Sequence, residues 1–184
     1  MAPFAAKKLA PVLRHNDMSK VRRVLDVGCG PGTNTAYFRD TEYVGVDINP
    51  HYVSWAQRHY QREFVVADIR TYEFPTGGKF DFVLMNSFLH HVNTEEAGRI
   101  LAGVARALAP NGSVHILDLV LAEEPSVARW MAKHDRGKFA RPLEEWRRLF
   151  ASVFDIQVFE PYGVPVLGVT LSDMLYCKGR KKQQ

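Results

Sequence analysis

The chain has 184 residues, of which 46% are hydrophobic and 24% charged, with a formal net charge of +4. This length suits a single domain over residues 1–184, and the composition excludes a fibrous or wholly disordered protein. No apolar run approaches the roughly 20 residues of a membrane span, so we expect a cytoplasmic protein. Two cysteines, Cys29 and Cys177, are too few for a disulfide framework and lack metal-ligand spacing, so no metal is predicted.

The positive charge is concentrated in two segments. Residues 129–148 carry seven Lys or Arg against three acidic residues, and residues 178–184 carry four Lys or Arg and no acidic residue. A basic chain end is usually solvated, so we expect residues 178–184 to be a frayed terminus rather than a nucleic-acid contact.

The first half of the chain alternates between predicted strands and helices. Apolar residues at helical spacing predict a helix within residues 1–20, ending near 16–19, that could cap a site. Short apolar runs predict buried strands at residues 24–27, 43–46, 64–67, 80–85 and 114–119. Helices are predicted at residues 33–40, 50–61 and 94–108, the last capped by Thr94, with a turn at 110–112.

The pattern changes after residue 119. Helices are predicted at residues 126–134 and 142–151, followed by strands at 153–160 and 169–177. No helix separates these two strands, and the Pro- and Gly-rich segment 161–168 joins them as a loop. The pattern therefore predicts an α/β fold, a Rossmann-like doubly wound parallel sheet closed by an antiparallel hairpin.

A glycine-rich turn follows the first predicted strand. Gly28, Gly30 and Gly32 alternate with other residues there, which allows a tight turn and close approach of backbone N–H groups to a ligand. Cys29 between them is a small side chain that such a turn tolerates. Alone, this turn is a weak signal that fits dinucleotide and adenosyl ligands equally.

Carboxylates add to this signal because they stand at three successive strand ends. Asp26 lies at the end of the first strand, Asp47 ends the second about 20 residues later, and Asp68 ends the third. The position of Asp47 is the one that binds ribose hydroxyls in nucleotide-binding Rossmann sites. Charges at the edge of a buried sheet cost free energy unless they are satisfied, so we expect a ligand there.

Five motifs in order resemble the class I S-adenosylmethionine-dependent methyltransferases, in particular the small-molecule, quinone-biosynthesis-like (type-11) branch. They read VLDVGCGPGT, VGVDIN, VVADIR, FDFVLMNSFLHHV and LAPNGSVHILD, within residues 21–118. The resemblance implies S-adenosylmethionine as cofactor and a seven-stranded sheet in the order 3-2-1-4-5-7-6. It implies these contacts: Asp26 and the 28–32 loop with the methionine portion, Asp47 with the ribose, Ile48 and Ile69 with the adenine, Asp68 with its amine, and Asn86 with the ammonium group.

The chemistry of the residues favours this cofactor over a dinucleotide. S-Adenosylmethionine carries a sulfonium and an ammonium group, which acidic strand ends suit. A pyrophosphate would be poorly served by Asp26 just before the glycines. Thr33 also stands where the dinucleotide motif has its third glycine.

The acceptor side is less defined. His91 or His90 could act as a general base for a hydroxyl acceptor, or could pack beside the helix that begins near Thr94. Asp118 could orient the substrate or be a solvated strand end. In the insertion at residues 122–142, Arg129, His134 and Arg141 could hold an anionic small-molecule acceptor, or could belong to a solvated helix face.

Two other function classes stay open at this stage. An RNA-modifying methyltransferase would use the basic segments as phosphate contacts. However, the N-P-P-[YF] segment of nucleic-acid amino methyltransferases is replaced here by Met85-Asn86-Ser87-Phe88, so nucleic acid is an unlikely partner. A non-catalytic module that binds S-adenosylmethionine and regulates a partner is the third class.

Overall fold

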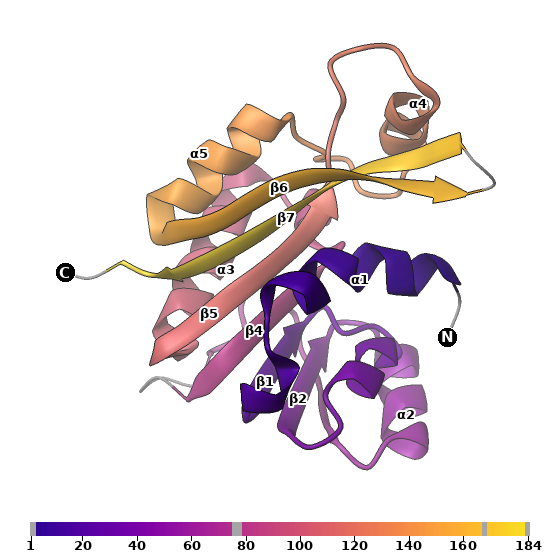
Figure 1. Ribbon diagram of the computed structural model, residues 1–184. Helices are drawn as coiled ribbons and strands as arrows, with labels where there is room; N and C mark the ends of the chain where they lie inside the picture. The colour runs from indigo at the N-terminus through magenta and orange to yellow at the C-terminus, as the bar shows by residue number, and fades with distance from the viewer. Residues whose placement is uncertain (1–2, 75–78, 167–168, 183–184) are drawn as a thin grey trace.

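A single seven-stranded sheet forms the centre of the computed structural model, which describes residues 3–74, 79–166 and 169–182. The strand order is β3-β2-β1-β4-β5-β7-β6, with β1 to β5 parallel and β7 antiparallel to both neighbours. The strands are β1 (Arg23–Val27), β2 (Glu42–Asp47), β3 (Glu63–Val66), β4 (Phe80–Asn86), β5 (Leu108–Leu119), β6 (Phe154–Val166) and β7 (Val169–Lys181). The predicted fold class and strand order are confirmed (Figure 1).

Helices cover both faces of the sheet. They are α1 (Pro3–His15), α2 (Pro50–His59), α3 (Thr94–Ala107), α4 (Val127–His134) and α5 (Leu143–Val153). Core residues of α3 and α5 pack on one face and those of α1 and α2 on the other; Figure 1 shows α1 in front of the sheet and α3 behind it. None of the described helices is both long and apolar enough to cross a bilayer.

The first strand shows how the sequence produces this layering. Leu25 and Val27 point to the α3 and α5 face, while Val24 points to the α1 and α2 face. All three are fully buried, and each such burial stabilises the fold by roughly 1.5–3 kcal/mol. The continuous apolar run is therefore explained by a strand that is covered on both sides.

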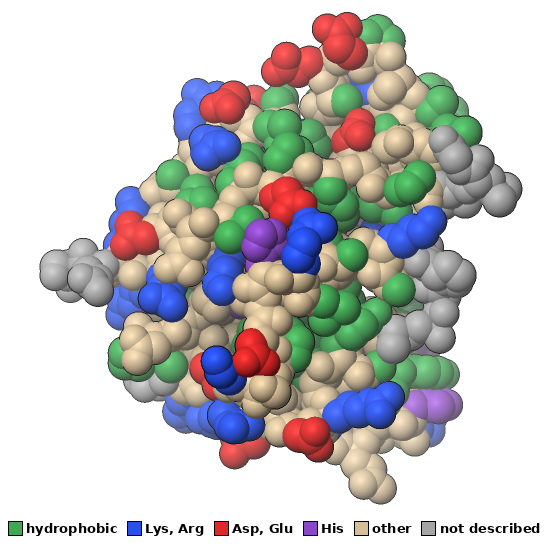
Figure 2. All heavy atoms as spheres, viewed as in Figure 1, with side chains coloured by type: hydrophobic (Ala, Val, Ile, Leu, Met, Phe, Trp, Pro, Cys, Tyr) green, Lys and Arg blue, Asp and Glu red, His purple; other side chains and the backbone are tan. Residues whose placement is uncertain are grey.

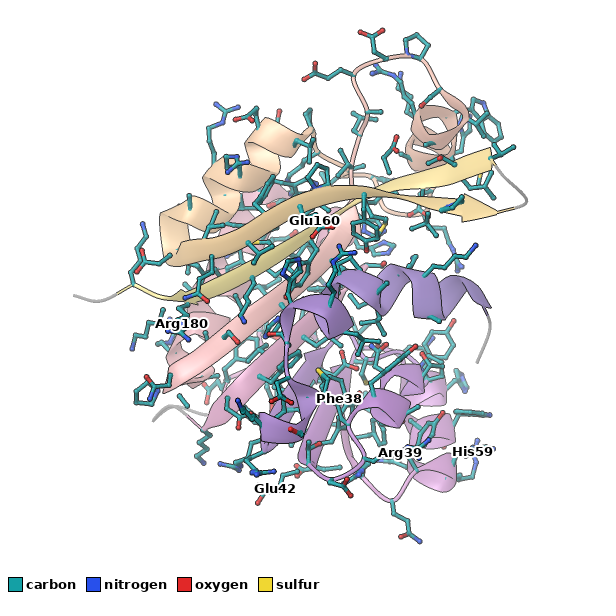
Figure 3. All side chains as sticks on the ribbon, viewed as in Figure 1. Phe38, Arg39, Glu42, His59, Glu160 and Arg180 are labelled. Atoms are coloured by element: carbon teal, nitrogen blue, oxygen red, sulfur yellow. The ribbon has the colours of Figure 1, made fainter. Side chains whose placement is uncertain are left out.

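The N-terminal helix is fastened to the C-terminal strands. Glu160 on β6 accepts hydrogen bonds from Arg14 and from His15 Nε2, the latter at 2.8 Å. Asn16 Nδ2 donates to the hydroxyl of Tyr176 on β7 at 3.0 Å. Figure 3 shows Glu160 above α1, and these contacts hold α1 and the residue after it against β6 and β7.

Three predictions in the first half of the chain were wrong in detail. Residues 33–37 form a short 3-10 helix, η2 (Thr33–Tyr37), instead of an α-helix over 33–40. The α3 helix is capped by Asn93, which forms a capping box with Glu96, and Thr94 is its first helical residue. Finally, the described residues between β3 and β4 form no helix, so the strict alternation is interrupted there.

The C-terminal strands are longer than predicted. The expected turn at residues 110–112 lies within β5, where the pairing with β4 is irregular. Pro161 and Pro165 belong to β6 and not to a loop. Proline has no N–H to donate, and it is tolerated in β6 because this is the edge strand, with a partner strand on one side only. Residues 178–181 pair within β7 and are not frayed; residues 167–168 and 183–184 of the predicted loop and tail lie outside the described residues.

Candidate functional site

A cavity of about 190 Å³ opens at the carboxyl ends of the first strands, where ligands of open parallel sheets bind. It is lined by Gly28, Val46, Asp47, Ile48, Ala67, Asp68, Ile69, Arg70, Phe88, His91 and Val92. Six predicted site residues are thus brought together: Gly28, Asp47, Ile48, Asp68, Ile69 and His91. Other predicted residues lie around this cavity without lining it: Asp26, Cys29, Gly30, Gly32, Asn86 and His90.

The glycine turn adopts a backbone that only glycine takes easily. Gly28, Gly30 and Gly32 have φ angles of 72°, 53° and 75°. A side chain on Gly32 would also meet the Phe64 ring at 2.9 Å, whereas the space next to Gly30 is open. Cys29 is buried beneath this turn, and burial raises the pKa of its thiol, so the thiol stays protonated at neutral pH.

Asp26 is a fully buried carboxylate behind the glycine turn. Its Oδ2 accepts hydrogen bonds from Asn34 Nδ2 at 3.0 Å and from the Tyr43 hydroxyl, while Oδ1 has no partner. Burial raises the pKa of Asp26 to about 6, against the lowering effect of both hydrogen bonds. An unpartnered buried oxygen of this kind is what a cationic ligand, bound directly or through water, would satisfy.

The two other carboxylates face the cavity from adjacent strands. Asp47 Oδ2 accepts from the Gly30 N–H at 2.8 Å and its Oδ1 from the Asn49 N–H at 2.8 Å, so Asp47 shapes the glycine turn as well. Arg70 donates two hydrogen bonds to Asp68, from Nε to Oδ1 at 2.9 Å and from Nη2 to Oδ2 at 2.6 Å. This arginine was missed by the sequence analysis, since its motif gives no sign that it folds back on Asp68.

Apolar side chains form the walls between these polar groups. Ile48 is 59% exposed and Ile69 is buried, and both side chains line the cavity. Phe88 contributes its ring from the chain after β4, so close to Gly28 that a Cβ atom on Gly28 would lie 3.1 Å from it. A flat, apolar ring system with polar edges would fit between these side chains.

The chain after β4 carries the sole non-glycine residue with a positive φ in the described part of the structure. This residue is Ser87, at φ 56°, and its hydroxyl donates to Asn86 Oδ1 at 3.2 Å. The same hydroxyl accepts from Lys8 Nζ at 3.0 Å, although Lys8 lies on α1. Strained backbone is concentrated at functional sites, and here it aims Asn86 and Phe88 at the cavity rim.

His90 and His91 have different surroundings. His90 is buried, with Nδ1 at 2.6 Å from Asp118 Oδ1 and Nε2 at 3.2 Å from Asp135 Oδ1. Burial opposes the charge on His90, but the hydrogen bond to Asp118 and the charges of both carboxylates raise its pKa overall. His91 is exposed and lines the cavity, and burial and the neighbouring His90 lower its pKa, which favours the neutral imidazole.

Asp118 holds the short 3-10 helix η3 (Leu89–His91) in place. It is buried, and its Oδ2 accepts from the Leu89 N–H at 2.7 Å while Oδ1 accepts from the Leu119 N–H at 2.7 Å. Because these contacts and the bond to His90 occupy the carboxylate, Asp118 is neither a solvated strand end nor open to an acceptor. It positions the turn that presents His91.

The three basic residues of the insertion do not form one anion site. Arg141 is buried and donates to the carbonyls of Leu89, Val92 and Phe139, so its guanidinium is engaged by the backbone, and its role in substrate binding stays a prediction. Arg129 Nη1 bonds the carbonyls of residues 122 and 123. His134 is exposed and stacks on Trp130, with ring centroids 4.3 Å apart.

These features together define a class of site: a Rossmann-like sheet end with a glycine turn, two cavity carboxylates and a buried, unpartnered carboxylate oxygen. These groups fit S-adenosylmethionine, because carboxylates suit its two cationic groups and would repel the pyrophosphate of a dinucleotide. A family model described as a methyltransferase domain matches residues 24–112 of the chain, which include every strand that contributes to the cavity.

Known proteins agree with this class. A ubiquinone biosynthesis O-methyltransferase of Idiomarina loihiensis is 28% identical over 187 residues, covering 90% of this chain and 75% of that protein. A SAM-dependent methyltransferase of Methanosarcina mazei shares the fold with a TM-score of 0.76 at 19% identity, covering 95% of this chain and 98% of the other. The 1,6-didemethyltoxoflavin-N1-methyltransferase of Burkholderia thailandensis, solved with bound 1,6-didemethyltoxoflavin and S-adenosylhomocysteine, has a TM-score of 0.73 at 24% identity, covering 98% of this chain and 80% of the other.

The matched domain, the relatives and the fold support a class I S-adenosylmethionine-dependent methyltransferase with S-adenosylmethionine as its cofactor, as the five motifs predicted. It spans only between 21% and 50% of the length of several other curated relatives that it matches. The matched segment ends at residue 112, so the insertion at residues 122–142 lies outside the part that the family model covers.

Proposed function

We propose that this protein transfers the methyl group of S-adenosylmethionine to a small-molecule acceptor. The observation that carries the proposal is the cavity itself, in which Asp47 and Asp68 stand at adjacent strand ends beside a turn of three positive-φ glycines. When bound, S-adenosylmethionine supplies an electrophilic methyl group on a cationic sulfur. The acidic cavity attracts that cation, and the half-enclosed shape excludes water from it.

Each cavity residue has a role in this proposal. Asp47 accepts hydrogen bonds from the ribose hydroxyls through lone pairs not used by the glycine turn. Ile48 and Ile69 hold the adenine between them, with the Ile69 N–H directed at a ring nitrogen. Asp68 accepts from the adenine amine while Arg70 keeps its carboxylate oriented.

The methionine portion of S-adenosylmethionine would lie at the glycine turn, away from the residues that hold the adenosine. Asp26 lies behind that turn with one oxygen unpartnered, so its charge stabilises the ammonium group without closing the cavity. Asn86, at the end of β4, adds an acceptor on the rim. The turn over Gly28 to Gly32, with buried Cys29 beneath it, forms the wall at this end, and its own N–H groups are donated to the Val46 and Cys29 carbonyls and to Asp47.

The acceptor binds beside His91, because this is the ionisable side chain of η3 that faces the cavity. His90 has a carboxylate at each ring nitrogen and is therefore a positioning group. Methyl transfer is an in-line displacement, so alignment of the acceptor atom with the methyl group contributes up to roughly 7–11 kcal/mol of the acceleration. The cap helix α1 and the insertion over residues 122–142 cover this side.

Calorimetric titration with S-adenosylmethionine tests the proposal. Asp47→Ala should weaken binding roughly tenfold to a hundredfold, since hydrogen bonds to a charged group contribute about 1.5–3 kcal/mol. Asp155→Ala is the matched control, because Asp155 is an exposed carboxylate on the distant edge strand. Wild-type affinity no tighter than that of Asp47→Ala would refute the cofactor site.

A further inference from the structure

Three groups that can ligate a metal converge at the acceptor side of the cavity. One ligand atom each from His90, His91 and Asp135 lies within 4.8 Å of the others. The distance from His90 Nε2 to Asp135 Oδ1 is 3.2 Å. Two ligands that share a metal at bonds of about 2.0–2.1 Å lie about 2.9–3.4 Å apart in octahedral or tetrahedral geometry, so this pair already has the required separation.

We propose that His90, His91 and Asp135 form a site for a divalent transition-metal ion, with Zn²⁺ as the best match to two imidazoles and one carboxylate. The two histidines come from η3 and the carboxylate from the chain after α4. The ion therefore joins the wall of the cavity to the insertion that covers the acceptor.

The surroundings of His90 are those of a metal ligand. Histidines that bind a metal through one nitrogen almost always donate the other N–H to a carboxylate or carbonyl. Here Nδ1 lies 2.6 Å from Asp118 Oδ1 and Nε2 lies 3.2 Å from Asp135 Oδ1, so a metal ion between Nε2 and Asp135 would take the place of the Nε2 proton while Nδ1–H stays bonded to Asp118. Asp118 is itself held by the backbone N–H of Leu89 at 2.7 Å, so the whole arrangement is preorganised.

The third ligand is held close by the backbone of its own segment. The Gly137 N–H donates to Asp135 Oδ1 at 2.8 Å, and the Phe139 N–H donates to the carbonyl of His90 at 2.9 Å. A side chain on Gly137 would lie 2.0 Å from the His90 ring, so only glycine lets the segment approach this closely. Asp135 is thus placed beside His90 by local geometry rather than by chance contact of an exposed side chain.

The proposed ligand set leaves one coordination position open. Two imidazoles and one carboxylate supply three ligands, and Zn²⁺ takes four in tetrahedral geometry. Because His91 lines the cavity, the fourth ligand comes from the acceptor side; an ionised oxygen of a phenol, enol or carboxylate fits, and this last step rests on the proposed function.

The experiment is a calorimetric titration of ZnCl₂ into the full chain, with one ligand removed at a time. His91→Ala and Asp135→Asn are suitable because both side chains are exposed, and thermal melts verify that the variants fold. His134→Ala is the matched control, an exposed histidine whose ring nitrogen bonds its own helix carbonyl. Titration of the same samples with S-adenosylmethionine separates this proposal from the cofactor site.

The expected result is one Zn²⁺ per chain, with binding weakened at least roughly tenfold by His91→Ala and by Asp135→Asn and unchanged by His134→Ala. Binding of S-adenosylmethionine should persist in Asp135→Asn and His134→Ala, because neither side chain lines the cofactor cavity. The metal site is overturned if the wild-type chain binds no Zn²⁺, or if all three variants bind it equally. Loss of S-adenosylmethionine binding by the wild type would instead count against the proposed function.

Discussion

Asp26 places a carboxylate where water does not reach, directly behind the turn that receives the cofactor. Its position at the end of the first strand was readable from the sequence, but its burial was not. Tyr43 and Asn34, which hold its Oδ2, come from β2 and η2, and only the folded sheet brings them to the same point. A sequence pattern could therefore predict which residues surround the ligand without showing which touch it directly.

The raised pKa of Asp26 has a measurable consequence for stability. Its folded-state pKa is about 6 and its ordinary value is 3.8, so the unfolded state loses the proton first. The contribution of protonated Asp26 to the free energy of unfolding is complete below pH 4 and is lost as the pH rises through about 6. Asp26→Asn keeps the shape without the charge and should gain about 3 kcal/mol relative to wild type between pH 4 and 7.

Urea denaturation of both proteins across this pH range provides the measurement, with Asp155→Asn as the exposed control. The same variant should lose affinity for S-adenosylmethionine at neutral pH, because the buried charge that balances the ligand's cation is gone. A stability difference that stays constant between pH 4 and 7 would show that Asp26 does not titrate as inferred.

At the scale of elements, the strands were the most predictable and their ends the least. The apolar runs of β1 and β4 are continuous because both faces are covered, and this pattern has no other common explanation. The ends depend on contacts across the sheet: β6 continues through Pro161 and Pro165 only because no strand lies beyond it. The true cap of α3 was missed because Asn93 and Thr94 are both good capping residues.

The cap of α3 can be tested by mutation. Asn93→Ala removes the side chain that accepts from the Glu96 N–H at 2.9 Å and should cost about 1 kcal/mol of stability. Thr94→Ser is the control, because it keeps the hydroxyl at the position that the sequence suggested as the cap. Chemical denaturation of both variants decides between the two residues, and an equal cost would exclude Asn93 as the sole cap.

Arg141 fastens the insertion to η3, and this contact predicts a stability effect rather than a binding effect. Arg141→Met removes donors to three carbonyls and should lower the free energy of unfolding by about 2–3 kcal/mol. Lys138→Met, an exposed basic residue of the same segment, should change it little. If Arg141→Met left stability unchanged and weakened only the acceptor, the original substrate-binding prediction would stand.

At the scale of the whole molecule, the two sides of the site differ in how far the sequence could predict them. The cofactor side is assembled from consecutive parallel strands, whose carboxyl ends must meet at one edge of the sheet. The acceptor side needs α1 and the segment after α4 to dock on η3. The contact of Lys8 with Ser87 spans 79 residues, and no local pattern encodes such a contact.

The distribution of charge over the folded chain bears on RNA as an alternative acceptor. Three residues of the two basic segments are not free surface charges: Arg141 is buried, Arg129 bonds carbonyls of its own loop, and Lys178 is half-buried in β7. On the face shown in Figure 2, Lys and Arg side chains are interspersed with acidic and apolar ones. A continuous track for a phosphate backbone is therefore absent from that face.

We accordingly expect no saturable binding of a single-stranded RNA near the physiological ionic strength of about 150 mM, measured by fluorescence anisotropy. Weak binding at low salt should disappear steeply as salt is added, because it comes only from scattered charges. Lys181→Gln together with Lys182→Gln should not alter this behaviour, since both side chains are exposed at the chain end. Binding that persists at 150 mM, and that this double variant weakens, would return RNA to consideration as the acceptor.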